Sequence, residues 1–207
     1  LKGNSIVLCS FGDASANHAT ALSAFNTASW ITSQGGHAPI IFICEDNGTG
    51  ISVPTDEKWI EQNFNNRHGI DYIQMDGLHL IDLMIKSRRA DHDCRINRSP
   101  IFLHMKTVRL MGHAGSDVEA GYKSLSEIEA TEFNDSLLHS ARILIENGCL
   151  SADDIVELYD SSRAQVNHVF DAVTLRPKLE TVEDVMASIT ENQIERIAPK
   201  YPTKKER

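Results

Sequence analysis

The sequence has little positive charge, no paired cysteine motif and no long apolar run. It contains 20 Lys and Arg residues and 29 Asp and Glu residues, which gives a net charge of −9. We therefore expect neither a nucleic acid nor a membrane surface as the main partner. No apolar stretch approaches the roughly 18 residues of a membrane helix, and no signal peptide is recognisable.

The cysteines show no CxxC spacing, which argues against a zinc or redox motif. They are Cys9, Cys44, Cys94 and Cys149. Cys9 and Cys44 lie in apolar, strand-like runs, so we expect free, buried thiols in a reducing compartment. Three histidines also lack metal-ligand spacing and are interpreted as structural or surface residues: His92, His104 and His139.

Short apolar runs alternate with helical patterns through the first two thirds of the chain. Strands are predicted at Ile6–Leu8, Ile40–Cys44, Asp71–Met75 and Pro100–Val108. Helices are predicted from Asn17 to Ser33, from Thr55 or Asp56 to Gly69, and from Leu78 to Arg89 with Leu80, Leu83 and Met84 inward. The run Ile6–Leu8 is typical of a strand buried on both faces. This order predicts an α/β fold, a parallel sheet with helices on both faces.

The last third of the chain contains helical patterns and no strand pattern. Helices are predicted at Ser124–Glu146, Ser151–Val173 and Thr181–Ile194, followed by a polar end, Pro199–Arg207. We therefore expect a domain over residues 1–150 and a helical extension and linker over residues 151–207. Because the chain begins with Leu and runs directly into a strand, we expect a fragment of a longer polypeptide.

Oxygen-bearing residues follow the first two predicted strands. Asp13 ends the first and Asn47 follows the second, and ligands bind at the carboxyl ends of parallel strands. An Asp carboxylate, an Asn amide and the Thr49 carbonyl suit Mg²⁺. Ala14 and Ser15 are small enough for backbone N–H groups to approach a phosphate, at the positive end of the following helix. The pattern predicts a site for a metal-chelated diphosphate.

Two segments carry a family resemblance that extends from about Ser5 to Tyr159. The first, FGDASANHATALSAFNTASW followed by PIIFICEDNGTGISVPT, resembles the thiamine-diphosphate motif of 2-oxoacid dehydrogenase E1 alpha subunits, which runs from GDG to a double Asn. The second, KTVRLMGHAGSD at Lys106–Asp117, resembles the family's TYR-x-x-GHS-x-SD loop, and Tyr122-Lys123 resembles a Tyr-Arg pair. The second segment favours an E1 component over other thiamine enzymes.

The resemblance implies roles for particular residues. Asp13, Asn47 and the Thr49 carbonyl would ligate Mg²⁺. His113 would face the cofactor, binding phosphate or assisting proton transfer as a catalytic residue. The remaining cofactor-binding residues would be Gly12, Ala14, Ser15 and Asn17, together with Asp13 and Asn47 themselves. Arg109 is open between two interpretations, a phosphate contact and an ion pair with an acid such as Asp117.

The chain departs from the family pattern at several positions. Ala14 stands where the family has Gly, which would cost about 1 kcal/mol if that position requires a positive φ. Asp46 replaces the first Asn of the pair, whereas Asn47 is retained. Met111 and Ala114 replace the His and Ser around the Gly-His pair, so a phosphorylation site found in some relatives is not supported.

By resemblance, the whole enzyme is an oxidoreductase that decarboxylates a 2-oxoacid with thiamine diphosphate and Mg²⁺ and passes the acyl group to a lipoyl-bearing E2 component. No segment resembles the family's pyrimidine-binding, beta-type domain, so we expect that domain as a partner, a homo- or hetero-oligomer, and no activity of these 207 residues alone. The resemblance implies a bacterial cytoplasmic or mitochondrial matrix location, with the cytoplasm preferred. The alternatives are a transketolase-like or other thiamine diphosphate enzyme and a degenerate, non-catalytic partner-binding module.

Overall fold

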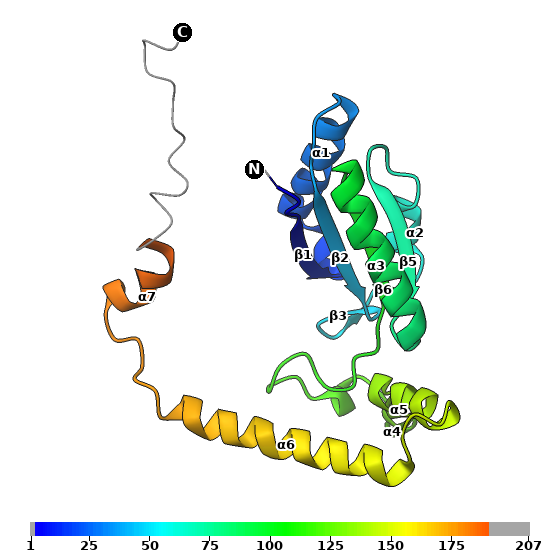
Figure 1. Cartoon of the computed structure of the whole chain (residues 1–207), viewed down its shortest axis with the longest axis vertical. Helices are drawn as coiled ribbons and strands as arrows, with labels where there is room; N and C mark the ends of the chain where they lie inside the picture. Colours follow the sequence, from blue (N-terminus) through cyan, green and yellow to red (C-terminus); the bar gives the residue numbers. More distant parts are fainter. Residues whose placement is uncertain (1–2, 191–207) are drawn as a thin grey trace. The chain divides into compact units, whose positions relative to one another are not determined.

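The computed structural model describes residues 3–190. The chain divides into two compact units, one ending at Ser151 and one beginning at Ala152 (Figure 1).

The first unit is built on a four-stranded, wholly parallel sheet with strand order β1-β2-β6-β5. The strands are β1 (Val7–Gly12), β2 (Ile40–Asp46), β5 (Asp71–Asp76) and β6 (Ile101–Lys106). The helices between them are α1 (Ala19–Ser33), α2 (Trp59–Phe64) and α3 (Leu80–Asn97). A short antiparallel pair, β3 (Thr49–Gly50) and β4 (Val53–Pro54), follows β2.

Phenylalanines fill one face of the sheet. Phe25 of α1 and Phe64 of α2 pack with Phe42 of β2 and Phe102 of β6, all at most 2% exposed. The Phe64 and Phe102 rings stack with centroids 4.0 Å apart, and the Phe25 and Phe64 rings meet edge to face at 5.0 Å. These large apolar side chains anchor α1 and α2 on this face.

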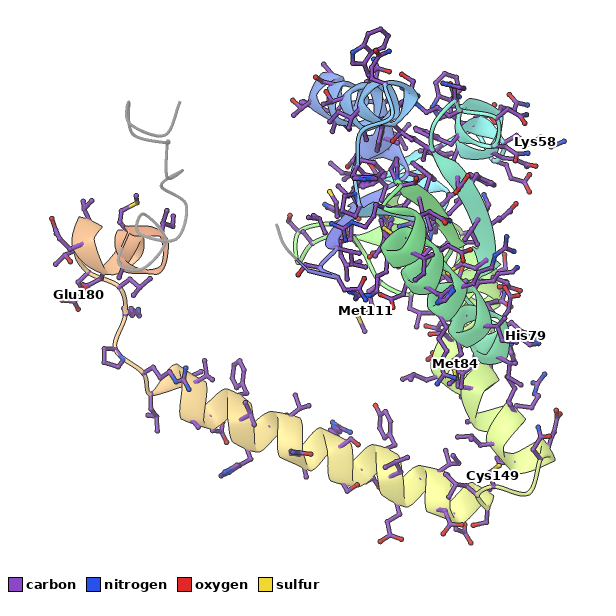
Figure 2. All side chains as sticks on the ribbon, turned by 45° about the horizontal axis from the view of Figure 1, so that its top comes forward. Lys58, His79, Met84, Met111, Cys149 and Glu180 are labelled. Atoms are coloured by element: carbon purple, nitrogen blue, oxygen red, sulfur yellow. The ribbon has the colours of Figure 1, made fainter. Side chains whose placement is uncertain are left out.

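Helix α3 covers the opposite face, in front of the sheet in Figure 1. Its buried residues Ala90 and Cys94 pack with aliphatic side chains of the strands, among them Ile41, Ile101 and Leu103. The prediction of an α/β fold with helices on both faces of a parallel sheet is therefore confirmed. Met84, labelled in Figure 2, is 48% exposed, so its predicted inward orientation is wrong.

Strand β1 is not buried on both faces, contrary to the sequence prediction. Within the described residues it pairs only with β2, and Val7 and Leu8 are 54% and 63% exposed. Cys9 is exposed for the same reason, so its predicted burial is wrong as well. An apolar run alone does not distinguish a central strand from an edge strand, because that depends on which strand lies alongside.

Several helix boundaries differ from the predicted ones. Helix α3 continues to Asn97 and ends at Arg98, which adopts a left-handed conformation with φ 54°. Helix α2 ends at Phe64, well before Gly69. The segment predicted as one helix over Ser124–Glu146 forms two, α4 (Leu125–Glu132) and α5 (Ser136–Glu146).

A capping residue explains the break between α4 and α5. The Leu137 amide donates to Oδ1 of Asp135 at 2.7 Å, so Asp135 begins a new helix. Ser124 and Glu127 form a reciprocal capping box at the start of α4.

The second unit contains α6 (Ala152–Thr174) and α7 (Val182–Thr190). The predicted end of the last helix at Ile194 and the predicted linker Pro199–Arg207 lie outside the described residues. In residues 3–190, no helix combines the length and apolar character needed to cross a membrane.

Candidate functional site

Three parallel strands end side by side at the carboxyl edge of the sheet. Gly12 of β1 pairs with Glu45 of β2, and Asp46 of β2 pairs with Lys106 of β6. Asp13 and Asn47 are therefore the first residues beyond two neighbouring strand ends, where parallel sheets hold their ligands.

Asp13 is a buried carboxylate, only 3% exposed. The Thr55 hydroxyl donates to its Oδ2 atom, and within residues 3–190 its other carboxylate oxygen makes no hydrogen bond. A cavity of about 260 Å³ opens here, lined by Asp13, Asn17, Thr55, Asp56, Trp59 and Ile60. A buried carboxylate with one uncommitted oxygen beside a cavity can serve as a ligand for a hard cation.

The small-residue turn after Asp13 is the 3-10 helix η1 (Ala14–Asn17). Ala14 is not among the residues with positive φ, so the replacement of glycine there causes no backbone strain. Ala16 is buried, whereas Ala14 and Ser15 are exposed. The Trp59 indole N–H donates to Asn17 Oδ1 at 2.6 Å, which fixes Asn17 on the wall of the Asp13 cavity.

Helix α1 begins only after this turn, at Ala19. Its N-cap is His18, whose Nδ1 atom accepts from the Thr20 amide at 3.2 Å. One of the N–H groups at the start of α1 is thus satisfied by the chain's own side chain. The backbone N–H groups of η1, which directly follow Asp13, are nearer to Asp13 along the chain than those of α1.

Asn47 begins a tight turn. Its Oδ1 atom accepts from the Thr49 amide at 3.0 Å, and Gly48 between them has φ 74°, a conformation that favours glycine. An amide oxygen carries two lone pairs, so this bond leaves one for a metal ion. The Thr55 amide donates to the Gly48 carbonyl at 3.0 Å and closes the loop around the β3–β4 pair.

Asn47 and Thr49 line a second cavity, of about 300 Å³. Its other lining residues are Thr107, Val108, Arg109, Lys123, Ala130, Thr131 and Asn134. The structure thus brings the predicted ligands to neighbouring strand ends, but Asp13 and Asn47 line different cavities.

Asp46 forms a buried polar cluster that the sequence does not predict. His104 Nε2 lies 2.7 Å and Lys106 Nζ 2.6 Å from Asp46 Oδ2, and the Gly48 amide donates to Oδ1 at 3.1 Å. Burial by itself raises the pKa of Asp46, but the hydrogen bonds from His104 and Lys106 outweigh it and lower the pKa to about 2. Asp46 is therefore ionised at neutral pH.

The cluster continues to Tyr72, whose hydroxyl lies 2.5 Å from His104 Nδ1. Burial, with the nearby charge of Glu61, raises the pKa of Tyr72 and keeps the phenol protonated. On this hydrogen-bond pattern, the Tyr72 hydroxyl donates to Nδ1 and His104 donates from Nε2 to Asp46. The one available sequence signal is the strand period of two, which puts His104 and Lys106 on the face of β6 that also carries Phe102.

Arg109 contacts both the turn between β3 and β4 and residues of its own loop. Its guanidinium donates to the Ile51 carbonyl at 2.6 Å and to the Tyr122 hydroxyl at 3.0 Å, and it lies 3.9 Å from Asp117 Oδ2. Within the described residues its buried Nε atom has no hydrogen-bond partner. Of the two interpretations of Arg109, a phosphate contact and an ion pair with an acid, the structure shows the ion pair, with Asp117.

His113 is held by its backbone rather than by its ring. Its amide donates to Asp117 Oδ2 at 2.6 Å, and this bond, with one from Tyr122, lowers the pKa of Asp117. The side chain is exposed and lines neither cavity described above.

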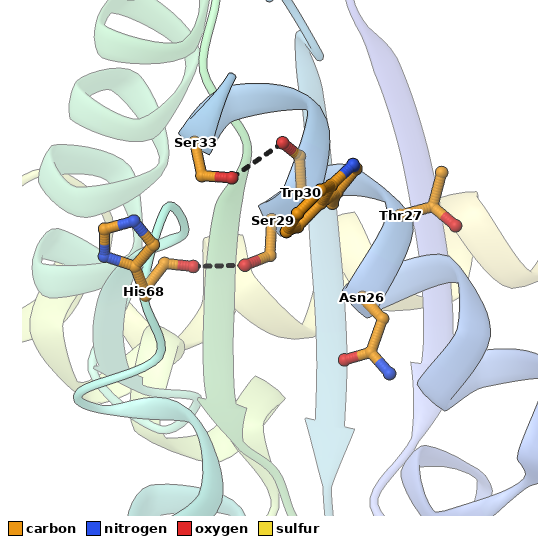
Figure 3. Close-up of a pocket in the computed structure, with 6 residues that line it drawn as sticks. All are labelled: Asn26, Thr27, Ser29, Trp30, Ser33 and His68. Atoms are coloured by element: carbon orange, nitrogen blue, oxygen red, sulfur yellow. Dashed lines mark hydrogen bonds between the residues drawn. The ribbon is translucent and has the colours of Figure 1, made fainter. Parts of the chain in front are cut away.

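Another cavity, of about 700 Å³, lies on the outer side of α1 (Figure 3). It is lined by Asn26, Thr27, Ser29, Trp30, Ser33 and His68. Ser29 donates its hydroxyl to the His68 carbonyl, and no predicted site residue lines this cavity. It therefore does not contribute to the site at the strand ends.

Among residues 3–190, no group of three or more His, Cys, Asp or Glu side chains is placed to hold a metal ion. A metal at these strand ends would therefore depend on amide and carbonyl oxygens as well as on Asp13.

Comparisons with known proteins identify the family of the chain. The family model described as "Dehydrogenase E1 component" matches residues 1–182. The chain is 26% identical over 179 residues to the pyruvate dehydrogenase E1 component subunit alpha, mitochondrial, of Dictyostelium discoideum, covering 85% of this chain and 46% of that protein. It is 27% identical over 181 residues to the human 2-oxoisovalerate dehydrogenase subunit alpha, mitochondrial, covering 86% of this chain and 40% of that protein.

The chain spans less than half the length of these relatives. The family match nevertheless extends over most of the 207 residues and includes every strand of the sheet. The chain belongs to the dehydrogenase E1 component family.

Proposed function

We propose that this chain supplies the Mg²⁺- and diphosphate-binding half of a thiamine diphosphate site in a 2-oxoacid dehydrogenase E1 component. The observation that carries the proposal is the buried Asp13 carboxylate at the end of β1, beside the Asn47 turn at the end of β2. Family membership supports the same assignment.

In this proposal Asp13, Asn47 and the Thr49 carbonyl hold the metal ion. Gly12, Ala14, Ser15 and Asn17 line the diphosphate, with Asn17 fixed by Trp59. The cofactor supplies the nucleophilic thiazolium carbon for decarboxylation of the 2-oxoacid. His113, exposed in its loop, binds phosphate or assists proton transfer once the loop meets the cofactor.

The remainder of the active site comes from a beta-type, pyrimidine-binding domain or subunit. The two relatives reported above are named alpha subunits. In this proposal a lipoyl-bearing E2 component accepts the acyl group. Exposed apolar residues on the edge strand, such as Val7 and Leu8, suit a protein contact. The named relatives are mitochondrial, one of the two locations implied by the sequence resemblance.

Calorimetric titration of the chain with thiamine diphosphate, with and without Mg²⁺, tests the cofactor site. We expect magnesium-dependent binding that is lost in Asp13→Ala and Asn47→Ala. Asp71→Ala is the matched control, since Asp71 is exposed at the opposite end of the sheet, at the start of β5. Unchanged affinity in both site variants would reject the assignment.

A 2-oxoacid decarboxylation assay tests the need for a partner. We expect no turnover by the 207 residues with thiamine diphosphate and Mg²⁺. Turnover would contradict the proposal that a beta-type, pyrimidine-binding domain supplies the remainder of the active site. If the wild-type chain binds no cofactor, the alternative of a degenerate partner-binding module is favoured instead.

A further inference from the structure

Lys106, at the end of β6, connects the ends of three strands. Its ammonium group donates to Asp46 Oδ2 at 2.6 Å and to the Glu57 carbonyl at 3.1 Å. Its own carbonyl accepts from the Gly77 amide at 2.7 Å, just beyond the end of β5. One side chain and one carbonyl thus tie β2, β5 and the segment before α2 to β6.

Asp46 uses each of its oxygens within the protein. Oδ2 binds Lys106 and His104, Oδ1 accepts from the Gly48 amide at 3.1 Å, and the carbonyl accepts from the Thr107 amide at 2.8 Å. With 3% exposure and these partners, Asp46 orients the turn that begins at the next residue, Asn47, and is not itself disposed to bind an external cation.

The contact between Lys106 and the Glu57 carbonyl also links Lys106 to Asp13, through Thr55. Glu57 lies two residues after Thr55, whose hydroxyl donates to Asp13 and whose amide donates to the Gly48 carbonyl. Lys106 therefore holds both ends of the segment from Asp46 to Glu57. This segment contains the predicted ligands Asn47 and Thr49, and its Thr55 hydroxyl contacts the third, Asp13.

We propose that Lys106 is a positioning residue of the metal site: by pairing with Asp46 and holding the Glu57 carbonyl, it fixes the Asn47 turn and Thr55 relative to Asp13. This inference rests on the proposed function, because it assigns Lys106 a role in that same site. Nothing in the arrangement requires Lys106 to touch the cofactor.

The pairing also accounts for the departure at position 46. The family's usual Asn is neutral, whereas the buried Asp46 carboxylate has a cation as its partner, with Lys106 Nζ at 2.6 Å and His104 Nε2 at 2.7 Å from Oδ2. Asp46 and Lys106 thus act as a matched pair. Replacing either one alone should weaken the order of the Asn47 turn and the affinity for Mg²⁺.

The test uses the full chain in four forms: wild type, Lys106→Met, Asp46→Asn and the double variant Asp46→Asn/Lys106→Met. Met retains the length of the Lys stem without the charge. Lys86→Met is the control, since it removes a lysine from another ion pair, with Asp82 at 2.9 Å on α3. Two quantities are measured: amide hydrogen exchange without metal, and the affinity for Mg²⁺ with thiamine diphosphate.

Without metal, Lys106→Met should accelerate exchange at Gly48 and Thr55 by about tenfold, corresponding to one lost hydrogen bond, while exchange at Cys94 in the core stays unchanged. Affinity should fall by roughly 10- to 100-fold, the usual effect of losing a group that orients a metal ligand. The double variant should recover part of both losses, and the Lys86 variant should show neither.

The outcomes separate this inference from the proposed function. If the wild-type chain binds no cofactor, the proposed function fails, and the exchange measurement still decides whether Lys106 orders the loop. If the wild type binds and Lys106→Met matches it in affinity and exchange, the inference is overturned and the site assignment stands. A double variant as impaired as Lys106→Met would refute the matched pair.

Discussion

Gly50 packs directly against Ala14: a Cβ atom added to Gly50 would lie 2.7 Å from the Cβ atom of Ala14. The contact joins strand β3, in the loop after β2, to the η1 turn that follows Asp13. The methyl group at position 14, where the family has glycine, is thus accommodated by a glycine opposite and not by a strained backbone.

This contact predicts a reciprocal pair of substitutions. Gly50→Ala should lower the free energy of unfolding by about 1–3 kcal/mol, the usual cost of overpacking. Adding Ala14→Gly should restore most of the loss, because it removes the clashing methyl group. Urea unfolding of the two single variants and the double variant measures the coupling. Additive losses would show that the two residues do not meet.

Thiol reactivity should separate the cysteines into two pairs. Cys44 and Cys94 are buried, and burial, joined for Cys44 by the charges of Asp46 and Asp13, raises the pKa of each thiol. Cys9 and Cys149 are exposed. We therefore expect a maleimide reagent at neutral pH to modify two thiols rapidly and two only on unfolding.

Replacement of both exposed residues, Cys9→Ser with Cys149→Ser, should abolish the rapid phase seen by mass spectrometry. Rapid modification of Cys44 in the folded chain would contradict its position in the core. Slow modification of Cys9 would instead show that the edge of β1 is covered in solution, for example by self-association.

The sequence predicts what depends on local pattern and not what depends on neighbours across the sheet. The strand ends at Asp13 and Asn47 follow from apolar runs and turn residues. The exposure of β1 does not follow from the sequence, because an apolar run such as Ile6–Leu8 can occur in an edge strand and in a central strand. The role of Lys106 depends on Asp46, 60 residues away in the chain, and only the pairing of β2 with β6 brings them together.

The stability contributed by Asp46 should depend on pH in a defined direction. Its pKa is lowered in the folded chain to about 2, from an ordinary value of 3.8. Ionised Asp46 therefore stabilises the fold above the unfolded pKa, and this contribution is lost as the pH falls from about 4 towards 2. In magnesium-free buffer, the difference in unfolding free energy between wild type and Asp46→Asn should shrink over this range.

The comparison with Asp46→Asn matters because other carboxylates titrate in the same range. Urea unfolding at pH 7, 4 and 3 gives the difference at each pH, and the shared titrations cancel. A difference that stays constant from pH 7 to pH 3 would mean that folding does not lower the pKa of Asp46.

Ile51 has a left-handed backbone conformation, with φ 57°, which a β-branched side chain rarely adopts. It lies between β3 and β4, is 59% exposed, and offers its carbonyl to Arg109 at 2.6 Å. The carbonyl contact links the Asn47 loop to the Arg109–Asp117 segment, so the strained conformation has a structural role.

Ile51→Gly should therefore stabilise the chain by up to about 1 kcal/mol, because the relief of strain exceeds the entropic cost of glycine and little apolar surface is lost. Val53→Gly is the matched control, as Val53 is 66% exposed in the same loop and has no positive φ. It should destabilise by about 0.5–1 kcal/mol. Thermal unfolding distinguishes the two: equal losses in both variants would mean that Ile51 stores no strain, whereas opposite signs identify it as the strained residue of the loop.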